Sequence, residues 1–309
     1  MFIIHYKKIF FILSGLLITF SIFTISAFGL NFGIDFKGGT LLEVAYLNNT
    51  QPELEKVKVD LQQLNLGNFA IQATTFATAQ DKIGGVILRT KDLTETERQS
   101  VMLALSQNGQ FQFEERGYNS VGPVIGQELR DKAFWAILLV LIFIVLFIAF
   151  AFRKVTAVAH PDNKVSSWKY GFATLIALAH DVIIPLGIFA LLGHFFVNYQ
   201  IDAVFVVAIL AILGFSVSDT IVVFDRIREN LSLSKKETFP EIVGKSLSQT
   251  IVRSIDTSVT TIIVLVALFF WGGEATRQFA LILSIGVIIG TYSSIFIASP
   301  LLLLFQKKK

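Results

Sequence analysis

The chain has 309 residues, of which 53% are hydrophobic and only 16% charged, and its mean hydropathy is +0.66. A soluble protein would carry roughly a quarter charged residues, so this composition favours a helical membrane protein with several spans. The formal net charge of +3 comes from basic residues near the ends of apolar runs, which argues against a nucleic-acid partner. The absence of cysteine excludes disulfides and thiolate metal sites, and four scattered histidines argue against a metal centre, so we expect no cofactor.

The first apolar run, Ile9–Phe28, follows Lys7 and Lys8. A basic start before an apolar stretch is shared by signal peptides and transmembrane helices. This run is longer than the roughly 7–15 residues of a signal peptide's apolar region, and Ser26–Phe28 is a poor cleavage site. We therefore predict an uncleaved signal-anchor helix within a first segment, residues 1–30.

Residues 31–131 are polar and divide into short elements. Four strand patterns and two helix-start signals follow in the order βαββαβ, which predicts a small α+β ferredoxin-like domain. The predicted strands are Leu41–Tyr46, Phe69–Phe76, Gly85–Thr90 and Phe111–Arg116. The predicted helices open with capping boxes, Thr50 with Glu53 and Thr94 with Glu97, and the second helix is expected to end near Gln107. The domain shows no catalytic constellation, so a folding and docking role is the simplest interpretation.

Residues 132–309 contain five more apolar runs that are long enough to span a bilayer. They are Ala133–Phe152, Tyr170–Leu192, Ile201–Phe224, Leu247–Trp271 and Phe279–Phe305. Together with the first run they predict six transmembrane helices, with both termini on one side. The second run has no polar residue beyond Trp135 and is expected to face lipid. The sixth carries small residues every four positions, which predicts close helix packing at Gly286, Gly290 and Ser294.

Basic residues predict which side of the membrane the termini occupy. Those on the side of the termini are Lys7, Lys8, Arg153, Lys154, Lys164, Lys169, Arg226, Arg228, Lys235, Lys236, Lys245, Lys307, Lys308 and Lys309. Of the opposite short loops, residues 193–200 contain no Lys or Arg and residues 272–277 contain a single one, Arg277. The positive-inside rule therefore predicts cytoplasmic termini and an extracytoplasmic domain at 31–131.

Two charged side chains lie inside neighbouring spans, where each costs roughly a few kcal/mol in lipid. Asp219 lies seven residues before Arg226, and Arg253 lies eight residues after Lys245. At about 1.5 Å per residue, both groups lie roughly 10–12 Å from the cytoplasmic end. We therefore predict that Asp219 and Arg253 form a pair within the bundle.

Other polar groups accompany this pair. The fifth span carries one polar helical face, and on the fourth span Ser216 shares a face with Asp219. The third span adds two ionisable groups near mid-bilayer, His180 and Asp181. The members of this set besides Asp219 and Arg253 are His180, Asp181, Ser216, Gln249, Asp256, Thr257 and Thr260. Carboxylates, an arginine and a histidine suit a proton relay, but buried polar groups also serve as glue between helices, and both interpretations stay open.

Two further chemistries are disfavoured. Gly244, Lys245 and Ser246 resemble the end of a phosphate-binding loop, but Phe239 stands where the motif requires glycine. Asp181 and Asp219 could form an intramembrane aspartyl protease. However, the residues before Asp219 read Phe-Ser-Val-Ser instead of the Gly-x-Gly of presenilin-type proteases. We therefore expect no nucleotide binding and no enzymatic activity.

Four motifs follow one another along nearly the whole chain: NFGIDFKGGT at 31–40, VGPVIGQEL at 121–129, ALAHD at 177–181 and GFSVSDTIVVFDRIREN at 214–230. This set resembles the SecF members of the SecD/SecF family of protein-export membrane subunits, which are relatives of the resistance-nodulation-division transporters.

The resemblance implies a subunit of the bacterial inner membrane that pairs with SecD and assists the SecYEG channel. Proton-motive force would move the outer domains and so pull unfolded, exported polypeptides outward. Asp219 and Arg253 match the proton-pathway positions of the family, whereas Asp256 stands where the family usually has a neutral residue, so it could compete for Arg253. A small-molecule or lipid exporter of the same superfamily is the alternative, and the coupling ion could be H⁺ or Na⁺.

Overall fold

The computed structural model describes residues 2–47, 50–77, 82–153, 166–196, 199–234 and 237–305. It divides into two compact units, a helical unit of Met1–Asn31 with Phe134–Lys309 and an α+β unit of Phe32–Ala133. Part of the predicted charge asymmetry falls outside the described residues, namely Lys154, Lys164, Lys235, Lys236, Lys307, Lys308 and Lys309.

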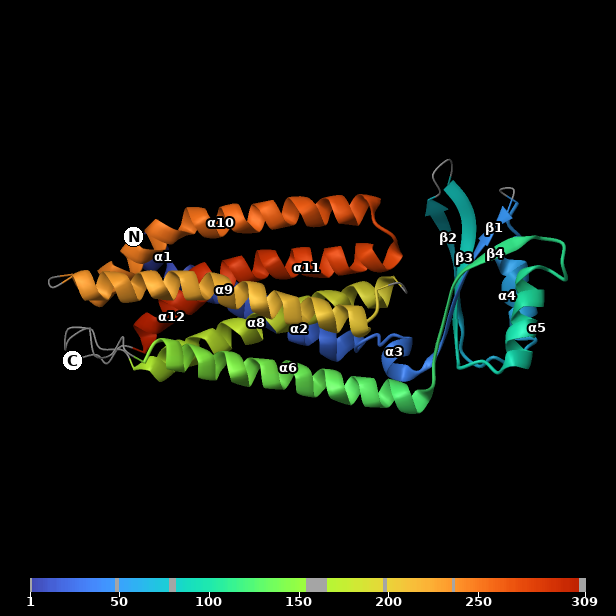
Figure 1. The fold of residues 1–309 in the computed structure, drawn as a ribbon, viewed down its shortest axis with the longest axis horizontal. Helices are drawn as coiled ribbons and strands as arrows, with labels where there is room; N and C mark the ends of the chain where they lie inside the picture. The colour runs from blue at the N-terminus through green and yellow to red at the C-terminus, as the bar shows by residue number, and fades with distance from the viewer. Residues whose placement is uncertain are drawn as a thin grey trace. The chain divides into compact units, whose positions relative to one another are not determined.

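Long helices make up the first unit and run side by side in Figure 1. They are α2 (Lys7–Phe28), α6 (Pro123–Ala151, which begins in the second unit), α8 (Ser167–Phe195), α9 (Ala203–Leu233), α10 (Phe239–Trp271) and α11 (Glu274–Ser293). A short helix, α1 (Phe2–His5), precedes them, and α11 continues through a π-helical turn, η3 (Ser294–Ala298), into α12 (Ser299–Leu304). Within the described residues, six helical segments are long and apolar enough to cross a membrane, which confirms the six predicted spans.

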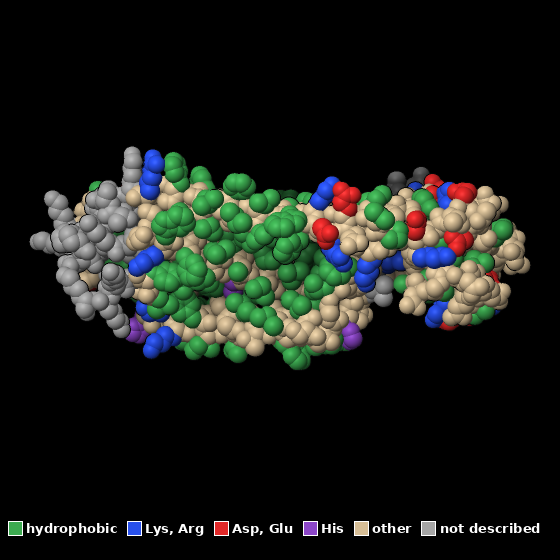
Figure 2. Space-filling model, turned by 90° about the horizontal axis from the view of Figure 1, so that it is seen from below, with side chains coloured by type: hydrophobic (Ala, Val, Ile, Leu, Met, Phe, Trp, Pro, Cys, Tyr) green, Lys and Arg blue, Asp and Glu red, His purple; other side chains and the backbone are tan. Residues whose placement is uncertain are grey.

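The centre of this unit is formed where α9 packs against α8, α10 and α11. The small-residue seam of α11 allows the close approach, since a Cβ on Gly286 would overlap the side chain of Ile212 and one on Gly290 would lie 3.0 Å from the Cβ of Ser216. Only 11% of the apolar window is buried in α6 and the same fraction in α10, whereas the corresponding fractions are 50% in α8 and 44% in α9. Figure 2 shows hydrophobic side chains covering the helical unit on the face drawn.

The second unit is a four-stranded antiparallel sheet in the order β2-β3-β1-β4, with two helices on one of its faces (Figure 1). Its elements are α3 (Ile34–Lys37), β1 (Gly39–Tyr46), α4 (Leu54–Gln62), β2 (Ala70–Ala77), β3 (Lys82–Thr90), α5 (Glu95–Leu105) and β4 (Phe113–Val121). Leu42 and Val44 of the sheet share one buried core with Val57, Leu61 and Val101 of the helices. The predicted ferredoxin-like fold is thus confirmed.

Two adjacent glycines lie where α3 joins β1, and neither could be replaced without strain. Gly38 and Gly39 have φ values of +77° and +133°, which side chains rarely adopt. A Cβ on Gly38 would lie 2.7 Å from the Cα of Pro123, and one on Gly39 would lie 2.5 Å from the carbonyl oxygen of Thr90. The glycine pair therefore lets the chain pass between the first residue of α6 and the end of β3.

The two predicted capping boxes have different outcomes. Thr94 and Glu97 form the predicted box at the start of α5. The box at Thr50 is wrong, because α4 begins only after Glu53 and the hydroxyl of Thr50 donates back to the carbonyl of Leu47. The helix α5 ends at Leu105, before the predicted Gln107, where φ becomes positive and a right-handed helix cannot continue.

The capping box of α5 yields a test of the second unit. Replacing Thr94 with alanine is expected to cost about 1 kcal/mol, since the N–H of Glu97 loses its cap. Amide hydrogen exchange of the first turn of α5, measured in the full chain, should become about fivefold faster. A Thr50→Ala chain is the control, because Thr50 caps no helix. Unchanged exchange in Thr94→Ala would contradict the prediction.

The same box has a pH dependence with a defined sign. Hydrogen bonds from Lys91 and Thr94 lower the pKa of Glu97 to about 2. A carboxylate whose pKa is lowered by folding stabilises the fold above its ordinary pKa, and the contribution disappears as the pH falls through the lowered value. The protection from amide hydrogen exchange that Glu97 gives the first turn of α5 should therefore be present at neutral pH and lost between about pH 4.5 and 2.

Candidate functional site

Asp219 lies in the middle of α9 and faces α10. Its Oδ1 accepts a hydrogen bond of 2.5 Å from the hydroxyl of Ser254, a fully buried side chain of α10. Its Oδ2 is also buried and has no hydrogen-bond partner among the described residues. A buried, unpartnered carboxylate oxygen is costly and calls for a water molecule or a proton at this position.

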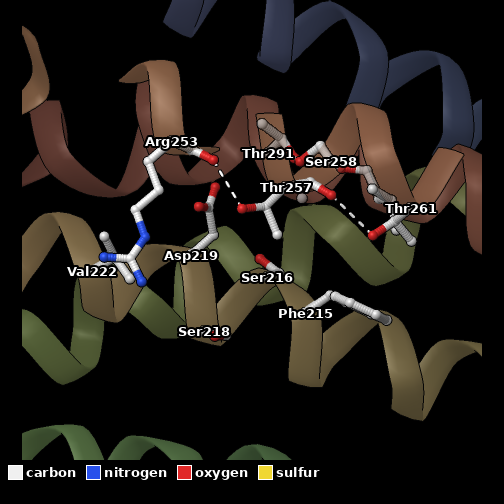
Figure 3. Close-up of a pocket in the computed structure, with 12 residues that line it drawn as sticks. Phe215, Ser216, Ser218, Asp219, Val222, Arg253, Thr257, Ser258, Thr261 and Thr291 are labelled. Carbon is white, nitrogen blue, oxygen red and sulfur yellow. Dashed lines mark hydrogen bonds between the residues drawn. The ribbon is translucent and has the colours of Figure 1, made fainter. Parts of the chain in front are cut away.

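A cavity of about 180 Å³ supplies room for such water. It lies between α9, α10 and α11 and is lined by hydroxyls as well as by the two charged groups (Figure 3). Its polar side chains are Ser216, Ser218, Asp219, Arg253, Thr257, Ser258, Thr261 and Thr291. Among the described residues that line it, Asp219 is the only acid and Arg253 the only base.

The structure brings Asp219 and Arg253 to one cavity but does not form the predicted ion pair. No salt bridge joins them among the described residues, although both line the same cavity. Asp256 forms no ion pair with Arg253 in the described part of the chain either, and it does not line the cavity. The two charges are therefore separated by a polar space instead of being in direct contact.

A second polar cluster lies immediately beside the cavity. Asp181 of α8 is fully buried, and its carboxylate is surrounded by three side chains. His180 Nδ1 lies 3.0 Å from Oδ1, while the hydroxyls of Ser216 and Ser293 donate to Oδ2 over 2.5 and 2.8 Å. Because Ser216 also lines the cavity, it connects Asp181 with the cavity that contains Asp219. The other ring nitrogen of His180, Nε2, is buried without a partner among the described residues.

The remaining predicted residues lie on α10 and are exposed. Gln249, Asp256 and Thr260 do not line the cavity, whereas Thr257 does. Gln249 accepts hydrogen bonds from Arg226 and Asn230 near the end of α9, so its contacts tie the two helices together. The hydroxyls of Thr257 and Thr260 donate to carbonyls of their own helix.

Sequence reasoning missed the inward-facing hydroxyls of α10. On α10 these follow a four-residue period that was available in the sequence: Ser246, Thr250, Ser254 and Ser258. Ser258 pairs with Thr291, and Thr220 pairs with Ser294, which connects α11 and η3 to α9 and α10. This period marks the face of α10 that packs inward, because small side chains allow close helix contact.

Two alternative chemistries find no support in this geometry. Asp181 does not line the cavity that contains Asp219, and both of its oxygens are occupied by His180, Ser216 and Ser293. Two aspartates that shared one catalytic water would have to face the same space. Gly244, Lys245 and Ser246 lie inside α10, where their backbone N–H groups belong to the helix and form no phosphate loop.

Comparison with known families decides the class of protein. The family model described as protein export membrane protein SecD/SecF, C-terminal, matches residues 101–160 and 165–308. The chain belongs to the SecD/SecF family. The SecD/SecF GG motif also matches residues 23–46, which contain Gly38 and Gly39, the adjacent pair with positive φ. As the first unit contains six apolar spans, this SecD/SecF chain is a multi-pass membrane protein.

Individual SecD/SecF proteins align with nearly the whole chain. The protein translocase subunit SecF of Thermobaculum terrenum is 41% identical over 99% of this chain and 94% of its own length. The subunit of the same name from Vibrio alginolyticus is 37% identical over 97% of this chain and 88% of its own length. The crystal structure of SecDF from Thermus thermophilus, a translocon-associated membrane protein, superposes with a TM-score of 0.80 at 30% identity. That match covers 99% of this chain but only 38% of the longer SecDF chain.

Proposed function

We propose that this chain is the SecF subunit of a Sec translocase accessory complex in the bacterial cytoplasmic membrane. It would act with SecD to assist export of unfolded polypeptides through SecYEG, driven by proton-motive force. The observation that carries the proposal is the polar cavity inside an apolar bundle, whose only acid and base among the described lining residues are Asp219 and Arg253. The SecF names of the relatives and the SecDF structure support the role in export.

Asp219 is the proposed proton carrier. Its Oδ2 has no hydrogen-bond partner among the described residues and is the oxygen that would take up the proton, while Ser254 donates to Oδ1. Protonation would remove the negative charge that faces Arg253 across the cavity, so the attraction between α9 and α10 would change with each proton. Asp181 and His180 form a proposed second proton-binding site, which Ser216 connects to the cavity. Because Asp256 does not line the cavity, we assign it no role in the proposed pathway.

The proposed topology would allow proton flow within the helical unit to act on a domain outside the membrane. We propose that both termini are cytoplasmic and that the α+β unit is outside. Lys7, Lys8, Arg153 and Lys169 support this orientation, since each lies at the end of a candidate span on the predicted cytoplasmic side. A change in the packing of α9 and α10 could then act on the outer unit through the helices that lead to it.

The experiment that tests the proposal compares export in membrane vesicles with and without this chain. A fixed amount of a secretory protein is translocated at saturating ATP, first with a proton gradient and then after a protonophore. We expect the chain to increase export only while the gradient is present, and a separate sodium gradient identifies the coupling ion. Equal export from vesicles that contain and lack the chain would contradict the proposal.

The alternative role as a small-molecule or lipid exporter has less support. Binding sites for such ligands usually enclose about 300–1,000 Å³, which exceeds the cavity of about 180 Å³ beside Asp219. The hydroxyls and charges around this cavity also suit water and protons better than an apolar ligand.

A further inference from the structure

The outer edge of β2 leaves a row of backbone groups unpaired. The strand lies at one end of the sheet order β2-β3-β1-β4, so a single neighbour, β3, pairs with it. That pairing runs through eight consecutive residue pairs without a shift, from Ala70 to Ala77. No other backbone segment hydrogen-bonds to β2 in the described part of the chain. The N–H and C=O groups on its outer side are therefore available to a further strand.

The opposite edge of the sheet, β4, differs in ways that discourage pairing. It carries three consecutive charged residues, Glu114, Glu115 and Arg116, and its register against β1 shifts between Glu43 and Val44. Charges and bulges are common devices by which proteins keep an exposed edge from pairing with another chain. The strand β2 reads AIQATTFA and has no charge, proline or register shift. Of the two edges, β2 is the one open to an additional strand.

The bulky side chains of β2 already pack against other residues of the domain. Ile71 packs against the core below the helices, and the ring of Phe76 lies against Gly85 of β3. Among the side chains of β2 whose exposure is described, the exposed ones are Ala73 and Thr75, which are small and neutral. Protein interfaces usually take most of their affinity from a few anchors such as Trp, Tyr or Arg, and these positions carry none. The edge therefore offers main-chain hydrogen bonds with little selection by side chains.

We propose that the β2 edge binds an extended segment of an exported polypeptide as a temporary fifth strand. The proposal rests on the export function proposed above. Strand addition takes its affinity from main-chain hydrogen bonds, which every unfolded polypeptide can form. It would let one surface accept exported chains of many sequences and release them readily.

Single cysteines test the proposal cleanly, because the natural chain contains none. The full chain is prepared as Ala73→Cys and, as a matched control on the other edge, as Glu114→Cys; both positions are exposed. Each is mixed under oxidising conditions with an unfolded secretory polypeptide that carries one cysteine at successive positions. We expect disulfides with Ala73→Cys, favouring alternate cargo positions as strand pairing requires, and few with Glu114→Cys.

A charge on the edge provides a second measurement. Adding Thr75→Lys to Ala73→Cys should strongly reduce cross-linking, because charged edges resist strand addition, whereas adding Thr96→Lys on α5 should not. Equal yields at the two edges, no effect of Thr75→Lys, or disulfides only between two copies of this chain would each overturn the proposal. Cross-linking needs no proton gradient, so its failure is distinguishable from a failure of gradient-dependent export.

Discussion

An Asp219→Asn chain is expected to insert and fold normally but to lose all gradient-dependent stimulation of export. Asparagine has nearly the same shape and can still accept the hydrogen bond from Ser254, so the packing of α9 against α10 should persist. It cannot take up or release a proton in the relevant pH range. Export with a proton gradient should therefore fall to the rate of vesicles that lack the chain, while the amount of chain in the membrane stays unchanged.

An Asp256→Asn chain is the matched control, because it makes the same chemical change on an exposed face outside the cavity. It should retain the stimulation by the gradient. If Asp256→Asn lost the stimulation and Asp219→Asn kept it, the exposed carboxylate would be the carrier and the assignment to the cavity would be wrong. This pair of variants thus decides which of the two acids near Arg253 carries the proton.

Replacing Asp181 with alanine is expected to cause the largest loss of stability among single changes near the site. The carboxylate is fully buried and meets His180, Ser216 and Ser293. Its removal leaves buried donors without an acceptor, each at about 1–3 kcal/mol, and creates a small cavity as well. We expect a cost of about 3 kcal/mol or more, measured as the free energy of unfolding of the purified full chain in detergent.

The control is Asp181→Asn, which keeps the shape and part of the hydrogen bonding. It should lose much less stability than Asp181→Ala, and a comparable loss in both would show that the charge itself holds α8, α9 and α11 together. Export by Asp181→Asn then separates the two roles of this group. Full gradient-dependent export would mean that Asp181 only joins the helices, and reduced export at normal stability would support a second proton-binding site.

Elements that depend only on residues close together in the sequence were predictable from the sequence. The six spans follow from the length of the apolar runs, and the capping box of α5 follows from Thr94 and Glu97, which lie within one turn. The box at Thr50 failed because the same residue types also form turns, and the hydroxyl of Thr50 bonds to Leu47. A local signal is thus reliable only where no competing local hydrogen bond exists.

The orientation of α10 was not predictable from local pattern. The predicted polar face carries Arg253, Asp256 and Thr260, but only Arg253 of these lines the cavity. The face that contacts α9 and α11 is that of Ser254 and Ser258. Both faces are polar, so periodicity alone does not distinguish them. The choice depends on which side chains are small enough to let α10 approach α9 and α11, and this is a property of three helices together.

The sequence by itself determined that the chain has six spans and that a ferredoxin-like unit separates the first two. It also placed Asp219 and Arg253 at a similar depth. The reason is that the length of an apolar run, the spacing of its apolar residues and the helical rise are local quantities. Only the tertiary structure decided that these two groups face a shared cavity without touching, that Ser254 holds Asp219, and that Ser216 links the cavity to Asp181. The physical reason is that a contact between helices depends on their rotation and packing distance, which the glycines and serines of α9, α10 and α11 set jointly.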